Sequence, residues 1–403
     1  MIYTYKYGNV TFMGTWSEWF IFMKKILFIT TIGGFLSQFE MNQVRILQSM
    51  GYEVHYASDF DNNFYEFDEK DLIKEGVIIH RVDIKKKPYR ILSNLKAIGQ
   101  IKEIVNNKEI DVIHCNNPLG GVCGRIAVVG SRIKPLVIYI AHGFHFYEGA
   151  PFINWLLFYP IEVFLARFTN VLLTINNEDY RRALRFDIKK GGFVAKVNGM
   201  GVDSKRFKPM PEIREEVRGE LNIPCDAFHI VTAAELNDNK NQRIVIEALA
   251  RCPYKKIHYS LCGVGENAKR LEELIKSLGL EDRIKLLGYR TDMERVLQSA
   301  DVFVFPSIRE GLGIAGVEAL MCNVPVVALD NRGTREYVRH MANGLVCRNN
   351  SIDSFKNAIM CLYENPKFLN KLSANGRQSV KRFSKTSVNN RFRKIYAKID
   401  SLL

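Results

Sequence analysis

The 403-residue sequence lacks the cysteine patterns that hold metals or form disulfide frameworks. Its eight cysteines include no CxxC pair and no Cys/His cluster with the spacing of metal ligands. Several lie inside apolar runs, as Cys262 does in HYSLC. We therefore expect reduced cysteines in the core of a cytoplasmic protein, and no structural zinc site.

Long apolar runs are also missing. The nearest to the roughly 18 uninterrupted apolar residues of a membrane-spanning helix is 152–175, which Glu162 and Arg167 interrupt. Residues 1–22 do not have the charge, apolar core and cleavage site of a secretory signal. We expect them to be a disordered tail or the product of an upstream start, because the first strand pattern begins near Met23. An interfacial anchor remains the alternative, built on Trp16, Trp19, Phe20 and Phe22.

Acidic residues are fewer than basic residues in this chain. The chain has 43 Asp and Glu against 57 Lys and Arg, a net charge of +14, which favours anionic partners. No nucleic-acid-binding signature accompanies this charge, so we expect no nucleic acid partner. Residues 351–403 hold eleven basic and three acidic residues. The basic residues of this segment, together with four aromatic residues of 152–168, suit peripheral contact with an anionic membrane. A buried helix beside a solvated basic tail explains the same residues equally well. The four are Trp155, Phe158, Tyr159 and Phe164.

Short apolar runs alternate with helical patterns along the chain. Such runs indicate parallel strands that are buried on both faces. The first set is 25–30, 53–58, 77–82, 111–116, 136–142 and 171–176, and the second is 229–235, 256–263, 284–289, 301–307 and 324–330. A stretch rich in Gly, Pro and charge, 197–212, separates them, and 366–403 has only helical periodicity.

This pattern predicts an α/β protein with two Rossmann-like, doubly wound domains. The expected domains are 23–197 and 198–383, and the helix of 384–403 is expected to cross back and pack on the first. In doubly wound domains, ligands bind outside the carboxyl ends of the strands. We therefore expect a ligand cleft between the two domains.

The segment PSIREGLGIAGVEALMCNVPVVALDNRG, 306–333, carries the most chemistry. A strand ends at Ser307, and two glycines precede a helix, so backbone amides and the helix N-terminus can bind an oxyanion. Glu310 in the loop and Glu318 in the helix can accept hydrogen bonds from sugar hydroxyls.

The segment closely resembles the E-x7-E signature of family 4 glycosyltransferases, which have the GT-B architecture. The resemblance extends over about residues 24–400 and includes DVFVFPS, VNGMGVD and DRIKLLGY. It implies that Glu310 contacts the transferred sugar and that Glu318 binds the nucleotide ribose. It also implies that amides hold the diphosphate, at Gly311, Leu312 and Gly313, and that Tyr289 and Arg290 lie by the base.

HIVTAAELNDNKNQ, 229–242, resembles the family segment that usually reads GRLxxxKG. Lys240 matches the diphosphate-binding lysine, but Glu235 stands at the usual arginine position. This departure removes one cation of the family clamp. We expect Glu235 to serve local structure, by bonding nearby backbone or by orienting Lys240.

The N-terminal half of the sequence gives weaker evidence for binding residues than the C-terminal half does. Gly33 and Gly34 follow the first strand and resemble the family's diphosphate-facing glycine loop, although a plain turn explains them nearly as well. His142 follows a strand and lines up with a histidine near the donor sugar, with His145 as a fallback. The DxD triplet Asp59–Asp61 resembles the metal motif of a different fold, and here we interpret it as a polar loop without a metal.

Together these features predict a hexosyltransferase-type glycosyltransferase. It would move a sugar from a nucleoside-diphosphate sugar, most plausibly a UDP-sugar, to a saccharide or lipid-linked saccharide in capsule, exopolysaccharide or O-antigen synthesis. The resemblance implies retention of configuration and no metal or other cofactor. The alternative is a UDP-sugar epimerase or another nucleotide-sugar enzyme of the GT-B fold, or a phosphorylase. A dinucleotide oxidoreductase is disfavoured because GxGxxG is absent after the first strand. The expected location is the cytoplasm, at the inner face of the membrane if lipid contact forms.

Overall fold

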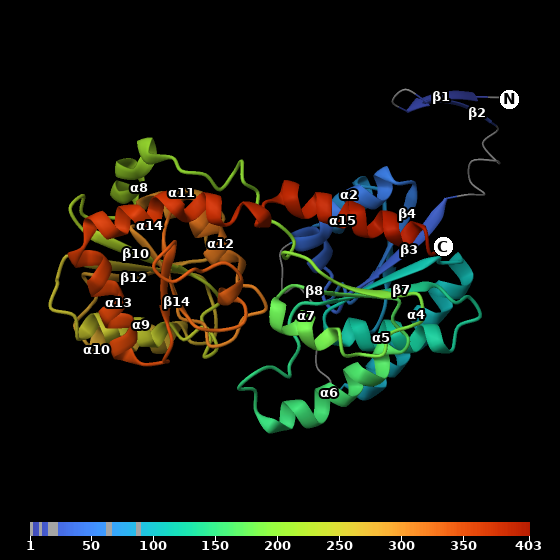
Figure 1. The fold of residues 1–403 in the computed structure, drawn as a ribbon, viewed down its shortest axis with the longest axis horizontal. Coiled ribbons are helices and arrows are strands. Elements are labelled where there is room, and N and C mark those ends of the chain that lie inside the picture. Colours follow the sequence, from blue (N-terminus) through green and yellow to red (C-terminus); the bar gives the residue numbers. More distant parts are fainter. Residues whose placement is uncertain (1–2, 8–9, 15–22, 62–66, 86–89) are drawn as a thin grey trace. The chain divides into compact units, whose positions relative to one another are not determined.

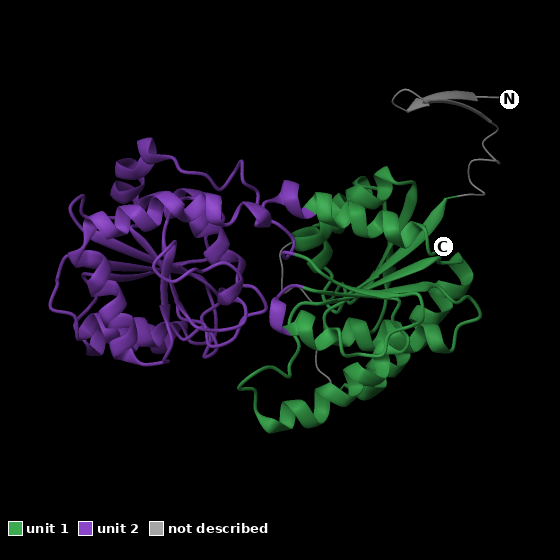
Figure 2. Cartoon of the chain, viewed as in Figure 1, with its two compact units in different colours: residues 1–174, 179–197, 389–403 green, residues 175–178, 198–388 purple. Residues whose placement is uncertain are grey.

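The computed structural model describes the backbone of residues 3–7, 10–14, 23–61, 67–85 and 90–403, and side chains from residue 23 onward. Figure 2 shows its two compact units. The first unit contains residues 1–174, 179–197 and 389–403, and the second contains residues 175–178 and 198–388. The suggested aromatic anchor at Trp16, Trp19, Phe20 and Phe22 lies outside the described residues.

The first unit is built on a seven-stranded sheet in the order β5-β4-β3-β6-β7-β8-β9, with every neighbouring pair parallel. Its inner strands are largely apolar and almost wholly buried, as expected for a sheet with helices on both faces, whereas the edge strands β5 and β9 are partly exposed. The strands are β3 (Lys24–Ile29), β4 (Tyr52–Ser58), β5 (Val77–Arg81), β6 (Val112–Asn116), β7 (Leu136–Ala141), β8 (Val171–Thr174) and β9 (Phe193–Lys196).

Helices cover both faces of this sheet (Figure 1). A short π-helix (Leu36–Glu40) leads into α2 (Met41–Ser49), which lies on the same face as the last helix, α15 (Lys385–Asp400). The opposite face carries α4 (Ile91–Lys108), α5 (Pro118–Val129) and α6 (Phe152–Ala166). The remaining helices are α3 (Glu69–Lys74) and α7 (Asn177–Ala183).

The second unit has a six-stranded parallel sheet in the order β12-β11-β10-β13-β14-β15. The strands are β10 (Phe228–Ala233), β11 (Ile257–Cys262), β12 (Ile284–Gly288), β13 (Val302–Phe305), β14 (Val326–Leu329) and β15 (Gly344–Cys347). The α-helices are α8 (Arg214–Glu220), α9 (Gln242–Ala250), α10 (Ala268–Ser277), α11 (Met293–Ser299), α12 (Ile314–Met321), α13 (Ile352–Glu364) and α14 (Pro366–Ser379). Short 3-10 turns occur at Pro211–Ile213, Thr334–Glu336 and Lys381–Phe383.

Two doubly wound parallel sheets confirm the predicted fold class. The sequence patterns did not indicate β9 or β15, which are edge strands of only four residues. Nor did they indicate the antiparallel pair of β1 (Tyr3–Tyr7) and β2 (Val10–Gly14).

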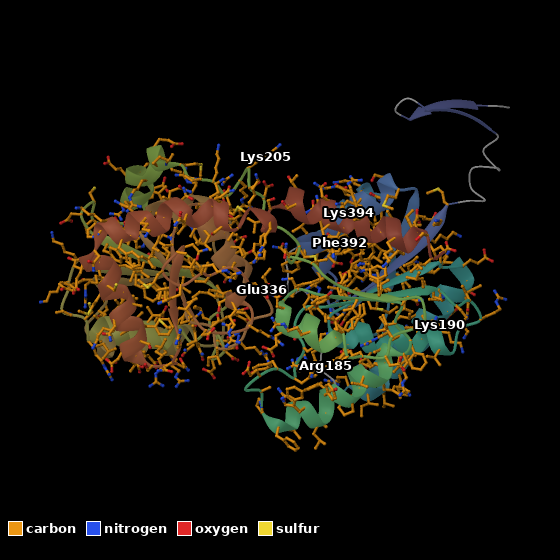
Figure 3. The ribbon with its side chains drawn as sticks, in the orientation of Figure 1. Arg185, Lys190, Lys205, Glu336, Phe392 and Lys394 are labelled. Atoms are coloured by element: carbon orange, nitrogen blue, oxygen red, sulfur yellow. The ribbon has the colours of Figure 1, made fainter. Side chains whose placement is uncertain are left out.

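The last helix is part of the first unit over most of its length. Phe392 of α15 is fully buried, whereas Lys394 is exposed on the same helix (Figure 3). At its end, the Asp400 carboxylate accepts hydrogen bonds from Lys24 Nζ at 2.7 Å and Tyr52 Oη at 2.6 Å. This helix therefore ties the last residues of the chain to the first strands of the sheet.

Helix α6 corrects one sequence-based interpretation. Trp155, Phe158 and Tyr159 pack against the core, and of the four aromatic residues only Phe164 is well exposed. The exposed face instead carries mostly aliphatic residues, and it lies across the sheet from α15. The basic C-terminal residues of α15 and this apolar face therefore do not form one surface. Among the described residues, no helix combines the length and apolar character needed to cross a bilayer.

Candidate active site

The loop between β13 and α12, and the first turn of α12, contain tightly packed glycines. Gly313 caps α12 with a φ of +81°, and a Cβ there would lie 2.6 Å from the Phe305 ring. A Cβ on Gly316 would lie 2.3 Å from the hydroxyl of Tyr337, which is buried and has no hydrogen-bond partner within the described part of the chain. Because side chains would not fit, the loop stays close to the sheet and its amides stand at the helix N-terminus.

Lys240 and Glu310 meet in this region. Lys240 lies between β10 and α9, and its Nζ contacts Glu310 Oε1 at 2.5 Å. The two side chains are 20% and 11% exposed, so the pair is partly shielded from water. The two loops are also joined by backbone, because the Ile308 amide donates to the Asn239 carbonyl at 2.8 Å. The matched lysine and the first glutamate of the signature are therefore neighbours, each neutralising the other.

Glu318 lies one turn into α12 and is not joined to this pair by any described hydrogen bond or ion pair. Burial raises the pKa of its carboxyl to about 7. Arg206 acts in the opposite direction, although its guanidinium is already paired with Glu294 at 2.6 Å. Glu318 is thus poised between its neutral and charged forms near neutral pH.

Glu235 behaves differently from one expectation. Its side chain is exposed and makes no described contact with Lys240, whose charge is held by Glu310 instead. Only the Glu235 backbone carbonyl takes part locally, as it accepts from Gln242 Nε2 at 2.9 Å. The expectation that Glu235 orients Lys240 was wrong, because the carboxylate nearest the lysine comes from another loop, 70 residues along the chain.

Tyr289 and Arg290 follow β12. Gly288 has a φ of +66° and ends the strand, so the next two residues turn away from the sheet. Tyr289 is 66% exposed. Arg290 forms a double contact with the Asp292 carboxylate, at 2.8 and 2.6 Å. Neither side chain has a described bond to the Lys240–Glu310 pair.

In the first unit, Gly33 and Gly34 are buried after β3. A Cβ on Gly33 would meet Phe67 at 2.9 Å and Phe60 at 3.0 Å, so packing alone already requires glycine at this position. The Tyr56 hydroxyl lies 2.9 Å from the Gly33 carbonyl oxygen. The loop is therefore well ordered by its contacts with the sheet.

His142 directly follows β7 and takes part in a buried polar cluster. Its Nε2 lies 3.2 Å from Asn116 Oδ1, at the carboxyl end of β6. Asn116 in turn contacts Glu40 and His114. Sequence reasoning found His142 but missed its partners, although a polar residue ending an apolar strand, as Asn116 does in DVIHCN, was a usable signal.

The DxD triplet is occupied by protein contacts. Asp59 Oδ2 accepts from Lys85 Nζ at 2.8 Å, and Asp59 Oδ1 accepts from the Asp61 amide at 3.2 Å. Asp61 is exposed and lies 3.6 Å from Arg81. Within the described ranges, no group of three or more His, Cys, Asp or Glu side chains has the arrangement of a metal site.

Comparison with known proteins decides the family. The model for "Glycosyl transferase 4-like" proteins matches residues 25–176, and that for "Glycosyl transferases group 1" matches residues 213–379. EpsD of Bacillus subtilis (strain 168), which carries a glycosyltransferase name, is 36% identical over 93% of this chain and 96% of its own length. This chain belongs to that glycosyltransferase family.

Other relatives of the glycosyltransferase agree with this assignment. The "UDP-Gal:alpha-D-GlcNAc-diphosphoundecaprenol alpha-1,3-galactosyltransferase" of Escherichia coli is 26% identical over 72% of this chain and 76% of its own length. The structure of HepE from Anabaena, in complex with UDP and glucose, has a TM-score of 0.76 at 22% identity and covers 93% of this chain and 99% of that one. WaaG, a glycosyltransferase involved in lipopolysaccharide biosynthesis, has a TM-score of 0.71 at 16% identity, over 92% and 99% of the two chains.

The protein is thus an enzyme with the GT-B fold, as the signature predicted. None of these comparisons supports the epimerase alternative. The roles of the individual site residues stay predictions.

Proposed function

We propose that this glycosyltransferase moves a sugar from a UDP-sugar to a saccharide or lipid-linked saccharide during surface polysaccharide synthesis. The observation that best supports this proposal is the Lys240–Glu310 pair beside the 311–313 loop. The pair supplies a cation and an acceptor for hydroxyl groups, and the loop supplies free amides in the same place. The names of relatives support the substrates: HepE was crystallised with UDP-glucose, and the Escherichia coli enzyme is named for UDP-Gal and a diphosphoundecaprenol acceptor.

The proposed chemistry follows from the charges. When the sugar leaves, negative charge develops on the diphosphate, and Lys240 with the amides of Gly311, Leu312 and Gly313 would stabilise it. Glu310, released from Lys240 by the diphosphate, would accept hydrogen bonds from the sugar hydroxyls. Glu318 would accept from the ribose. The leaving phosphate can take the proton of the acceptor hydroxyl, so no separate base would be required. Lys240 and the amides would stabilise the diphosphate without a metal, and the family resemblance favours retention of configuration.

The other site residues have supporting roles in this proposal. Gly34 would present its backbone amide to the diphosphate, whereas the Gly33 amide already donates to the Asp59 carbonyl at 3.0 Å and would only shape the loop. His142 would contact the sugar. Tyr289 and Arg290 would lie beside the base. No bound cofactor takes part in these steps.

A donor screen tests the proposal. UDP-, GDP- and TDP-sugars are compared by thermal stabilisation and by hydrolysis or transfer to a lipid-linked acceptor, with and without EDTA. We expect a response to UDP-sugars that EDTA leaves unchanged, lost in Lys240→Met but kept in Arg243→Met, whose arginine pairs with Glu247 on the helix surface. Stabilisation by GDP- or TDP-sugars alone would reject the donor, and loss with EDTA would reject metal independence.

We also propose contact with an anionic membrane, now on α6 rather than on the basic C-terminal stretch. Its outer face is an unbroken apolar surface, and its one acid, Glu162, is buried against Arg125. Exposed basic residues follow in the chain, including Arg167, Arg181 and Arg185 (Arg185 is marked in Figure 3), which suits an anionic lipid surface. The apolar positions are Phe152, Ile153, Leu156, Leu157, Ile161 and Phe164, each 45% to 78% exposed.

Vesicle sedimentation tests this contact. We expect binding to phosphatidylglycerol vesicles that weakens with salt and is lost in Leu156→Glu. Leu92→Glu is the matched control, because Leu92 is 83% exposed on α4. Binding that Leu156→Glu leaves intact, or a Leu156-dependent dimer in place of vesicle binding, would reject a membrane role for α6.

A further inference from the structure

A buried polar network surrounds Asn116 at the carboxyl end of β6. Asn116 Nδ2 lies 2.8 Å from Glu40 Oε2 and 3.2 Å from His114 Nδ1, while Asn116 Oδ1 lies 3.2 Å from His142 Nε2. Beyond His114, its Nε2 lies 3.2 Å from the hydroxyl of Tyr396 on α15. Glu40, His114 and Asn116 are fully buried, so each hydrogen bond has to be made within the protein.

The surroundings of Asn116 determine which way its amide points. Its NH2 group has two protons, and Glu40 Oε2 and His114 Nδ1 both offer lone pairs to them. Burial lowers the pKa of His114 to about 3, so this ring is neutral, and when its Nδ1 accepts from Asn116 its single proton lies on Nε2, toward Tyr396. Burial also raises the pKa of Glu40 to about 8, so near pH 7 this carboxyl is largely neutral and Oε2 accepts from Asn116 as its unprotonated oxygen. Turning the amide over would set its oxygen against both acceptors, and the proton positions of Glu40 and His114 would have to change together.

The amide orientation fixes the state of His142. Because Asn116 Oδ1 faces His142 Nε2, the ring has to donate from Nε2. Burial lowers the pKa of His142 to about 4, so the ring is neutral near pH 7 and its Nδ1 keeps a lone pair. Among the described residues Nδ1 has no hydrogen-bond partner. The Phe35 ring packs edge-on against the imidazole, with centroids 5.4 Å apart, and limits its rotation.

We propose that Asn116 is a positioning residue of this enzyme: held by Glu40 and His114, it locks His142 as the tautomer protonated on Nε2, with Nδ1 ready to accept a hydrogen bond from a substrate hydroxyl. Glu40 holds the amide through Oε2, and its other oxygen has no hydrogen-bond partner within the described residues. A buried carboxyl in this position costs stability, and a role in orienting Asn116 accounts for its presence. The inference rests on the proposed function only in assigning the hydroxyl to a sugar.

The tautomer is measured without substrate, by long-range ¹H–¹⁵N NMR of histidine-labelled full-length protein at pH 7. The chain has eight histidines, and the His142 signal is identified by its loss in His142→Gln. We expect the Nε2-protonated form in the wild type. Asn116→Leu should give a mixture of tautomers, whereas Asn116→Asp, which keeps an acceptor oxygen opposite Nε2, should retain the Nε2-protonated form.

Two further variants complete the NMR test. Glu40→Leu removes the oxygen that accepts from Asn116 Nδ2, so it should also give a mixture, and it provides the test if Asn116→Leu does not fold. His145→Gln changes a nearby ring that packs at a tilt against Phe158, with centroids 4.6 Å apart, and should leave the His142 tautomer unchanged. A mixed or Nδ1-protonated His142 in the wild type would overturn the proposal, as would a pure Nε2-protonated form in both Asn116→Leu and Glu40→Leu.

Kinetics separate this inference from the proposed function. Asn116→Leu should lower kcat/KM for the intact UDP-sugar roughly tenfold, the effect of one hydrogen bond, and leave the affinity for free UDP within about twofold. An equal loss of UDP affinity would indicate general disruption and overturn the positioning role. If the tautomers behave as expected but no sugar nucleotide is turned over, the proposed function fails while the positioning of His142 stands.

Discussion

The Lys240–Glu310 pair makes a prediction about free nucleotide. UDP carries the diphosphate but not the transferred sugar, so when it binds Lys240 it has to displace Glu310 without giving that carboxylate a new partner. Glu310→Gln removes this competition. We therefore expect Glu310→Gln to bind UDP more tightly than the wild type while losing sugar transfer, and Lys240→Ala to bind it more weakly.

The size of the effect follows from the contact. The atoms are 2.5 Å apart and the side chains only 20% and 11% exposed, so the attraction is stronger than that of a surface pair. Contacting groups of this kind couple by about 0.5–3 kcal/mol after desolvation is included. Because about 1.4 kcal/mol is a tenfold change, UDP affinity should rise between about twofold and a hundredfold, centred near tenfold.

Isothermal titration of UDP into the wild type, both single variants and the double variant measures the coupling directly. Glu247→Gln is the matched control, because this carboxylate pairs with Arg243 at 2.7 Å on the helix surface and should not affect UDP binding. If Glu310→Gln weakened UDP binding as much as Lys240→Ala, Glu310 would itself hold the nucleotide, and the division of roles would be wrong.

Two further predictions concern α12. The pKa of Glu318 is about 7, so below that pH the carboxyl is protonated and loses the charge that accepts hydrogen bonds from ribose hydroxyls. UDP affinity, measured by titration calorimetry, should therefore rise from pH 6 to pH 8, and Glu318→Gln should flatten this rise. A pH profile that Glu318→Gln leaves unchanged would contradict a ribose contact. Gly316→Ala would place a methyl group 2.3 Å from the Tyr337 hydroxyl and should destabilise the second unit by about 1–3 kcal/mol, measured as a lower Tm. The control is Gly219→Ala, whose methyl group meets nothing within 4 Å and should not lower the Tm. Equal Tm values for the two variants would show that Tyr337 moves aside without cost.

The fold was accessible from sequence because buried parallel strands leave continuous apolar runs. KILFIT and DVFVFPS are such runs, and both contain central strands of the two sheets. FVAK and GLVC, the edge strands β9 and β15, pair on one side only and have four residues each. A segment this short has too few alternations or apolar neighbours to be distinguished from a loop.

The site was accessible only where its residues are close in sequence or match a known signature. Glu310 and Glu318 lie in one loop and helix, so spacing alone connects them. The Asn116 network joins residues 40, 114, 116, 142 and 396, and no spacing rule connects positions so far apart. Glu235 shows the converse limit, because a position can match a family site while its side chain makes no contact there.

The position of α15 has a consequence for how the chain folds during synthesis. Domains usually fold from the N-terminus as they leave the ribosome. Here the first unit lacks residues 389–403 until the second unit has been made. Lys24 and its partner Asp400 are 376 residues apart in the sequence, so this contact can form only at the end of synthesis. Until then the surface that receives Phe392 and Tyr396 is uncovered. The nascent first unit is therefore expected to present an apolar patch to chaperones throughout translation of the second.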